Sequence, residues 1–495
     1  MRSPKKKSLL LALLPLFFLI LFLSANVLIF KENTLDGSNQ IILLLAAAFA
    51  SVLAYRYKIK WISIRDSILQ NIGKAMPAML ILLLIGSLAG TWLISGVVPA
   101  MIYYGIKIIN PKVFLLTALV VSGLVSLATG SSWSTIATIG VALLGIGKAL
   151  GFHEGLVAGA IISGAYFGDK MSPLSDTTNL APAVAGTDLF THVRYMMTTT
   201  TPSLTIAILI FTGIGIFYEF SEASTNITGV IESISSSFYI SPVLLLVPVI
   251  LIVVIIRKVP PLPSLMIGTL LGGIFAVIFQ PGIIRELSQV DSNYLVQSYK
   301  SFMHAMFGEV TIASENEIVN ELFHTGGMAG MLNTVWLIIS AMTFGGSMQA
   351  AGFLSRITEA IISRVKSTGS LIASTIGTSI FFNLTASDQY IAIVVPGHMY
   401  ADTFRDYGLK PEVLSRTLED GGTLTSVLIP WNTCGATQSR VLGVSTWTYL
   451  PYCFFNLVNP LVAIFMAYAG IKLRRLDNNV TEQKEDTIQE EIIKP

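Results

Sequence analysis

The sequence predicts an all-α protein that crosses a membrane many times, and three observations support this. The chain has 495 residues, of which 53% are hydrophobic and only 12% are charged, whereas soluble domains carry about 25% charged residues. Its mean hydropathy is +0.70. Many windows approach the roughly 20 apolar residues that a helix needs to cross a bilayer core of about 30 Å. The net charge of +2 gives no indication of nucleic-acid binding.

The apolar segments divide into complete spans, interrupted spans and short paired arms. Complete spans are predicted at 8–30, 40–56, 76–95, 198–218, 241–256, 262–280, 332–352 and 450–470. Interrupted spans are predicted at 155–183 and 418–443. The short arms are 113–128 with 133–148, and 368–384 with 388–400, and each pair is joined by a polar tip. Because each arm is short for a complete crossing, we expect two re-entrant hairpins.

The distribution of basic residues orients these segments. If the N-terminus is placed inside, most of the 31 lysines and arginines fall on the inner side, including those of the predicted loop 56–74. Such an excess is typical of cytoplasmic loops. We therefore expect both termini in the cytoplasm, with 476–495 as a polar cytoplasmic tail.

Residues of similar type recur at a nearly constant separation, which predicts an internal repeat. The clearest pairs are Gly96 with Gly352, Gly164 with Gly421, Pro173 with Pro430, and Gly186 with Gly443. Residues 1–220 and 241–475 then each contain five spans, one of them broken, and a re-entrant hairpin. Because five crossings is an odd number, the second half must be inverted relative to the first. Inverted repeats with broken helices are typical of secondary transporters.

The segment 168–187, GDKMSPLSDTTNLAPAVAGT, is the most unusual part of the chain. It carries charged and hydroxyl side chains between apolar segments, although a charge in hydrocarbon costs several kcal/mol even on lenient scales. Its prolines and glycines interrupt the helix, which a membrane tolerates only where the backbone lines a cavity or is enclosed by protein. We therefore interpret this segment as part of an ion or substrate site.

Three further polar segments are expected to converge with it under the repeat symmetry: the hairpin tips 129–135 and 383–388, and the second break 430–438. Their hydroxyls, amides and carboxylates are hard oxygen ligands, which suit a small alkali cation. The candidate ion-binding or proton-binding residues are Asp169, Asp176, Asp388, Thr177, Thr178, Asn179, Ser131, Ser132, Asn432 and Thr433. We expect Na⁺ chiefly at Asp176, Asn179 and Asp388. A carboxylate removed from water retains a proton more readily, so Na⁺ and H⁺ can compete for the same oxygens.

Each charged candidate also has a structural interpretation. Asp176 could cap the half-helix that starts near Thr177, and Asp388 could cap the second arm of its hairpin. Asp169 and Lys170 could form an internal ion pair that makes both charges tolerable in the membrane. Alternatively, Lys170 could stand in for the cation when the site is empty.

Three motifs carry a resemblance to a known family. The run GDKMSPLSDTTNLA at 168–181 closely resembles the signature of NhaC-type Na⁺/H⁺ antiporters, and TGSSWST at 129–135 and PWNTCGA at 430–436 fit the same family. The resemblance implies a bacterial inner-membrane protein that exports Na⁺ in exchange for external H⁺, without a cofactor.

The layout is also similar to the wider ion-transporter superfamily with paired re-entrant hairpins, whose members are commonly dimers. In those relatives a transport domain slides against a fixed scaffold. By this resemblance, 113–200 and 368–445 are expected to be mobile, and 40–95 and 241–352 are expected to form the scaffold and the contacts of a homodimer.

A second function stays open at this point. One branch of the same family takes up malate with protons and exports lactate with Na⁺. Arg440, predicted at membrane depth, could hold the carboxylate of such a substrate or could pair with a carboxylate of the protein. The motifs GxSxG and HExxH are not seen, so the sequence gives no indication of a hydrolase.

Overall fold

The computed structural model describes residues 8–30, 37–219, 227–314, 320 and 322–476. Within this part of the chain, eight helices are long and apolar enough to cross a membrane, or up to ten if each of two bent helix pairs counts as one span. The prediction of an all-α, multi-pass membrane protein is confirmed. The basic N-terminal residues 1–7 and, apart from Leu476, the predicted tail lie outside the described residues.

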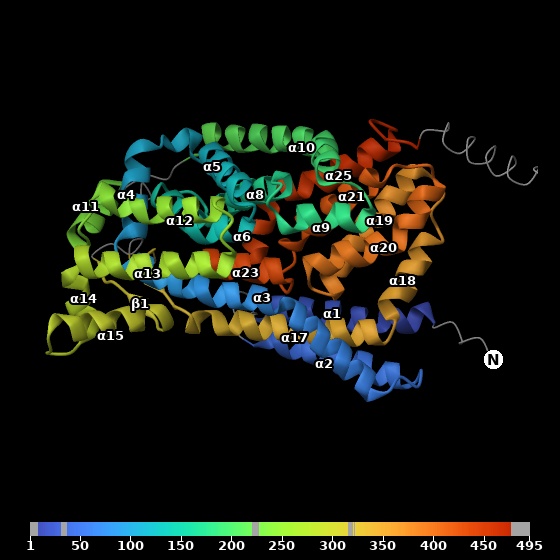
Figure 1. Ribbon diagram of the computed structural model, residues 1–495, viewed down its shortest axis with the longest axis horizontal. Coiled ribbons are helices and arrows are strands. Elements are labelled where there is room, and N and C mark those ends of the chain that lie inside the picture. Colours follow the sequence, from blue (N-terminus) through green and yellow to red (C-terminus); the bar gives the residue numbers. More distant parts are fainter. Residues whose placement is uncertain (1–7, 31–36, 220–226, 315–319, 321, 477–495) are drawn as a thin grey trace, which may run out of the picture.

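The first half of the chain runs from α1 to α10. Its elements are α1 (Leu9–Phe30), α2 (Ser38–Tyr55), α3 (Trp61–Ile94), α4 (Val97–Ile108), the 3₁₀ turn η2 (Pro111–Val113), α5 (Phe114–Thr129), α6 (Ser132–Thr135), the π-helix η3 (Ile136–Gly140), α7 (Val141–Ala149), α8 (Glu154–Met171), α9 (Asp176–Ala185) and α10 (Leu189–Phe217). The long helices lie side by side along the horizontal axis of Figure 1.

The second half begins with α11 (Ile227–Ser237), η5 (Pro242–Leu245), α12 (Leu246–Ile256), α13 (Pro261–Phe279), α14 (Pro281–Ser288), α15 (Tyr294–Phe307), the short antiparallel strands β1 (Val310–Thr311) and β2 (His324–Thr325), and η6 (Ala329–Met331). It continues with α17 (Leu332–Ala350), α18 (Phe353–Ile362), α19 (Thr368–Thr385), α20 (Gln389–Asp406), α21 (Pro411–Leu418), the π-helix η7 (Glu419–Thr423), α22 (Leu424–Ser426), α23 (Thr433–Leu442), α24 (Thr446–Tyr449), η8 (Leu450–Tyr452) and α25 (Phe454–Tyr468). Helices α11 and α14 lie at the end of the molecule opposite to the start of α1 (Figure 1).

The main error in the predicted spans concerns α3, which was expected to begin at residue 76. The helix begins at Trp61, so most of the predicted loop 56–74 is helical. Its first turns carry polar side chains that bond to α17: Ser67 Oγ donates to the Gly346 carbonyl at 2.9 Å, and Asn71 Nδ2 donates to Gln349 Oε1 at 3.0 Å. These contacts allow the helix to extend beyond its apolar run.

Two of the residue pairs that predicted the repeat have matching backbone conformations. Gly96 and Gly352 are left-handed, with φ of 76° and 63°, and each separates a long helix from a shorter one. Gly186 and Gly443 are also left-handed, with φ of 81° and 68°, and each ends the second half of a broken helix. Glycine adopts this conformation without steric cost. The inversion of the two halves and their bounds, 1–220 and 241–475, stay predictions.

Helices α5 and α8 approach each other closely enough that their backbones touch. A Cβ atom at Gly164 would overlap the carbonyl oxygen of Leu119, and one at Gly168 would overlap that of Gly123. Small residues permit such contacts between membrane helices. This contact places the end of the first hairpin arm beside the last turn of α8, where Asp169 lies.

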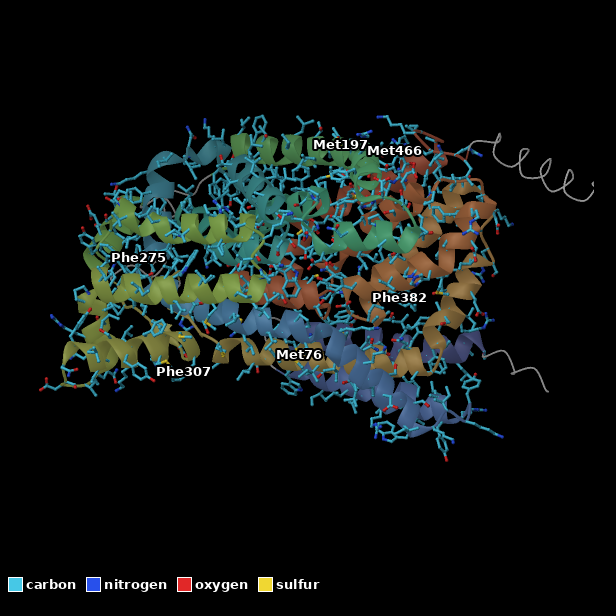
Figure 2. The ribbon with its side chains drawn as sticks, in the orientation of Figure 1. Met76, Met197, Phe275, Phe307, Phe382 and Met466 are labelled. Carbon is cyan, nitrogen blue, oxygen red and sulfur yellow. The ribbon has the colours of Figure 1, made fainter. Side chains whose placement is uncertain are left out.

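The distribution of side chains suits a protein surrounded by lipid. Met197 on α10 and Phe307 on α15, at opposite edges of Figure 2, are 52% and 54% exposed. Large apolar side chains are exposed along many of the long helices, whereas soluble monomers rarely expose large contiguous apolar patches. Polar residues such as Asn383, Asp420 and Asn432 are fully buried. The polar groups that could form a site therefore lie in the interior of the protein.

Candidate functional site

The four polar segments singled out in the sequence all contribute to one cavity of about 720 Å³. Helix α3 and the connection 255–263 between α12 and α13 form the remaining walls. The polar residues of the four segments that line the cavity are Thr129, Ser131, Ser134, Asp169, Ser175, Asp176, Thr177, Asp388 and Thr433, and Gln389 and Tyr390 of α20 lie beside them. The chain thus gathers three carboxylates and several hydroxyls around one space.

The first hairpin tip is shaped by a glycine and a serine cap. Helix α5 ends because Gly130 adopts φ of 70°. A Cβ atom on Gly130 would lie 2.7 Å from the backbone carbonyl carbon of Leu174, so glycine permits the close approach of the tip to the first break. Ser131 Oγ then accepts a hydrogen bond from Ser134 N at 3.2 Å and caps α6.

Asp169 lies in the last turn of α8 and faces the cavity, with 7% of its surface exposed. Its Oδ2 accepts hydrogen bonds from Ser132 N at 3.1 Å and from Ser132 Oγ at 2.7 Å. Bonds to a carboxylate are short and strong. Ser132, a predicted ion-binding residue, therefore holds Asp169 in position and is not among the described residues that line the cavity.

The first break follows Met171, and Pro173 lies within it. The cap of α9 is Ser175, whose Oγ accepts from Thr178 N at 3.5 Å. The interpretation of Asp176 as the cap is therefore wrong, because Asp176 is the first residue of the helix. Its exposed carboxylate faces the cavity, at the end of α9 where the helix dipole favours negative charge.

Two of the predicted ion-binding residues instead satisfy the carbonyl groups that the break leaves open. Thr178 Oγ1 donates to two carbonyl oxygens of the last turn of α8, at 3.0 and 3.1 Å. Asn179 Nδ2 donates to the carbonyls of Pro173 and Ser175, at 2.9 and 2.7 Å. Thr177 is among the described residues that line the cavity, but Thr178 and Asn179 are not. Asn179 is therefore not brought together with Asp388.

Asp388 caps a helix, as one interpretation of it expected, and also lines the cavity. Its Oδ1 accepts from Ile391 N at 3.0 Å and caps α20, and the residue lines the cavity with 3% of its surface exposed. The preceding Ser387 has φ of 58°, an uncommon conformation for a residue other than glycine.

The second break is tied to the second hairpin tip by neutral groups. Asn432 Nδ2 donates to the Asn383 carbonyl at 3.2 Å and to Asn383 Oδ1 at 3.1 Å, while its own Oδ1 accepts from Cys434 N at 3.0 Å. Thr433 N donates to the Ser387 carbonyl at 2.9 Å. Thr433 lines the cavity, whereas Asn432 is buried behind the described lining.

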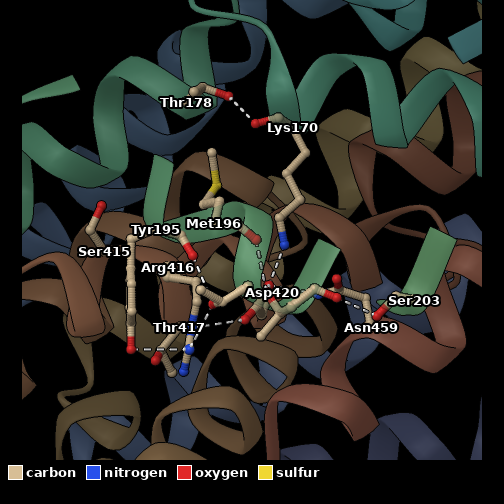
Figure 3. A network of polar contacts seen from close by, with 12 residues as sticks. Lys170, Thr178, Tyr195, Met196, Ser203, Ser415, Arg416, Thr417, Asp420 and Asn459 are labelled. Carbon is tan, nitrogen blue, oxygen red and sulfur yellow. Dashed lines mark hydrogen bonds and ion pairs between the residues drawn. The ribbon is translucent and has the colours of Figure 1, made fainter. Parts of the chain in front are cut away.

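Asp169 and Lys170 do not form the ion pair that was considered for them. Lys170 Nζ instead bonds to Asp420 Oδ1, and both side chains are fully buried. The same oxygen accepts from Asn459 Nδ2 at 2.6 Å and from Thr199 Oγ1 at 3.3 Å. Arg416 Nε lies 3.5 Å from Asp420 Oδ2. Figure 3 shows this cluster, which we call the Asp420 network. Sequence reasoning missed it because its members come from α8, α10, α21, η7 and α25.

The basic residues near the cavity also differ from the expectation. Arg440 is exposed and lies beside Gly330, where a Cβ atom would be 2.9 Å from its Nη2. It is not among the described lining residues, whereas Lys74 of α3 and Lys258 after α12 are. Both lysines belong to segments that were predicted on the inner side of the membrane, and this was the signal in the sequence that could have indicated them.

The donor set indicates the kind of ligand. Among the described residues, no group of three or more His, Cys, Asp or Glu side chains is arranged to hold a metal ion. The cavity instead offers carboxylate and hydroxyl oxygens, which favour hard cations over transition metals.

Comparison with known proteins places the chain in a family. The Na⁺/H⁺ antiporter family matches residues 164–471. The chain is 36% identical over 427 residues to the Na⁺/H⁺ antiporter NhaC of Bacillus subtilis, which covers 86% of this chain and 91% of that protein. It is 34% identical over 449 residues to the malate-2H⁺/Na⁺-lactate antiporter of the same organism, covering 90% and 93%.

A third relative is the arginine/ornithine antiporter ArcD of Halobacterium salinarum, 33% identical over 481 residues that cover 96% of this chain and 95% of that protein. All three relatives are named as antiporters, and none is named as an enzyme. The family match spans more than half of the chain, and the relatives match along nearly their whole length. The chain is therefore a multi-pass membrane antiporter that belongs to the Na⁺/H⁺ antiporter family.

Proposed function

We propose that this antiporter exports Na⁺ in exchange for H⁺ by alternating access, and that both ions use the cavity. The observation that carries the proposal is the presence of Asp169, Asp176 and Asp388 around one cavity, together with hydroxyl groups. The name of the NhaC relative supports the same ions. The expected setting is a bacterial inner membrane, with a homodimer whose segments 113–200 and 368–445 move.

The exchange follows from competition for the carboxylates. An ionised carboxylate and a Na⁺ ion about 4 Å apart attract each other by about 4 kcal/mol at an effective dielectric constant of about 20. A proton on the same carboxylate removes the negative charge and most of that attraction. A proton that arrives from one side therefore releases Na⁺, and Na⁺ that arrives from the other side displaces the proton.

The test uses everted membrane vesicles from a strain that lacks its own antiporters. An acidic interior is established, Na⁺ is added outside, and the fluorescence of a pH indicator is followed. We expect Na⁺ alone to release protons from the vesicles. If Na⁺ produces no response above that of vesicles without the protein, Na⁺/H⁺ exchange is not the activity.

Na⁺-coupled exchange of organic acids is the second candidate, and one observation favours it. Lys74 and Lys258 line the same cavity, whose volume of about 720 Å³ far exceeds what a single Na⁺ fills. A carboxylate-bearing solute needs cationic partners, and these two lysines could supply the contact for which Arg440 was one candidate. The malate-lactate relative supports this alternative.

The same vesicles separate the two candidates. A response to Na⁺ that appears only when malate or lactate is also present identifies organic-acid exchange. In that case, the double substitution Lys74→Gln and Lys258→Gln should abolish the response to the acid. A response to Na⁺ alone that persists in the double variant supports cation exchange.

A further inference from the structure

Asp169 and Lys170 are neighbours in the chain, but their charged groups lie in different environments. The Asp169 carboxylate faces the cavity and is held by Ser132. The Lys170 ammonium points into the fully buried Asp420 network (Figure 3). Adjacent side chains of a helix project in different directions, so the Lys170 ammonium reaches Asp169 only if its flexible stem bends back toward the cavity. In the structure the stem extends to Asp420 instead.

Asp420 is well placed to retain the lysine. Its Oδ1 accepts hydrogen bonds from Lys170, Asn459 and Thr199, which come from three different helices. The other cation of the network, Arg416, is also anchored elsewhere: its Nη1 donates to the Tyr195 hydroxyl at 3.2 Å, and its guanidinium lies 4.9 Å from the centre of the Tyr195 ring.

The network also lies outside the cavity. Its charged members, Lys170, Arg416 and Asp420, are fully buried and are absent from the described residues that line the cavity. Asp420 therefore contributes no oxygen to the cavity. Its influence on a cation there has to act through another residue, and Lys170, which follows Asp169 in α8, provides such a connection.

We propose that Asp420 is a positioning residue for cation binding: it holds the Lys170 ammonium away from the cavity, and so leaves the Asp169 carboxylate available to the transported cation. This inference rests on the proposed function. The lysine side chain is a flexible four-carbon stem that carries a compact charge. Without Asp420, its ammonium turns toward Asp169 and competes with Na⁺ as a tethered cation.

The test compares Asp420→Asn, Lys170→Met and the double variant in proteoliposomes, with Na⁺ half-saturation, maximal rate and thermal stability measured for each. We expect Asp420→Asn to raise the half-saturating Na⁺ concentration by about tenfold or more, because a tethered group competes at millimolar effective concentration. Adding Lys170→Met should return it to within about twofold of the wild-type value, because the competing ammonium is gone.

A purely structural role predicts a different pattern. Loss of packing lowers the thermal stability or the maximal rate, without a selective change in Na⁺ half-saturation that Lys170→Met reverses. Asp420→Glu, which keeps the charge, should retain wild-type half-saturation. Asp402→Asn, which removes an 85% exposed carboxylate on α20, is the matched control.

The outcomes separate this inference from the proposed function. If the wild-type protein shows no Na⁺-dependent exchange, the proposed function fails. If the wild-type protein exchanges Na⁺ but Asp420→Asn leaves its half-saturation unchanged, or Lys170→Met does not restore it, the inference fails. If Asp420→Asn does not fold, the test uses the double variant, which contains neither charge of the pair. A half-saturating Na⁺ concentration above the wild-type value in that variant overturns the inference.

Discussion

Replacing Asp176 by Asn removes one negative charge from the cavity with little change in shape. Asp176 is the first residue of α9, its side chain is exposed, and Ser175 provides the helix cap. The fold therefore loses only the interaction of the carboxylate with the positive end of the helix dipole, about 0.3–1 kcal/mol. We expect the variant to insert and fold as the wild-type protein does.

The expected effect on transport is much larger than the effect on stability. A carboxylate about 4 Å from Na⁺ contributes about 4 kcal/mol at an effective dielectric constant of about 20. Each 1.4 kcal/mol corresponds to about a tenfold change in affinity. The unscreened interaction corresponds to about 700-fold. Because Asp176 is partly open to water, which screens its charge, the half-saturating Na⁺ concentration should rise by less than this, roughly 10-fold to 100-fold. Exchange should then be strongly reduced at ordinary Na⁺ concentrations.

The everted-vesicle assay measures this change directly, with the amount of inserted protein determined in the same vesicles. Asp402→Asn is the control, because it removes a carboxylate that is 85% exposed on α20. Near-normal Na⁺/H⁺ exchange in Asp176→Asn would remove this residue from the mechanism and leave Asp169 and Asp388 as the ion-binding carboxylates.

Three further substitutions test how the site is supported. Ser132→Ala removes the 2.7 Å hydrogen bond to Asp169, worth about 1.5–3 kcal/mol for a charged partner, and should raise the half-saturating Na⁺ concentration. An unchanged value would show that the backbone N–H of residue 132 is sufficient to position Asp169. Gly168→Leu forces a side chain into the α5 backbone and should lower the thermal stability of the protein in detergent. Gly213→Ala is the control, because no other described atom lies within 4 Å of the added Cβ. Equal stability of the two variants would refute the close contact between α5 and α8. Asn432→Ala leaves buried partners unsatisfied and should lower the same stability by about 1–3 kcal/mol; an unchanged melting temperature would contradict this.

The features of the site that depend on local sequence could be predicted. A proline in an apolar stretch indicated the first break near Pro173, and polar residues between paired apolar arms indicated the turns after Thr129 and Thr385. That these helix pairs are re-entrant stays a prediction, because Pro111–Thr129 and Ser132–Ala149 are each long and apolar enough to cross a membrane. Left-handed glycines such as Gly130 end helices for reasons that lie within the local backbone. Hydropathy alone placed the start of α3 too late, because its first turns are polar and bond to α17.

The features that depend on tertiary packing could not be predicted. Asp169 is the neighbour of Lys170 in the sequence, so local reasoning paired them, whereas the actual partner, Asp420, comes from the other half of the chain. The position of Arg440 likewise depends on how α23 is rotated about its axis, which its own sequence does not determine. The cap of α9 was ambiguous because adjacent Ser175 and Asp176 are both residue types that cap helices.

The backbone contact between α5 and α8 has a consequence for the transport cycle. Interlocking side chains can change rotamers and so allow two helices to slide past each other. Gly164 and Gly168, however, contact backbone carbonyl oxygens directly, so no layer of side chains lies between the two helices at this contact. The first hairpin arm and the first half of the broken helix should therefore travel as one piece. A pair of cysteines placed across this contact should cross-link with equal efficiency in every state of the protein, and would serve as a fixed reference for the distances that change.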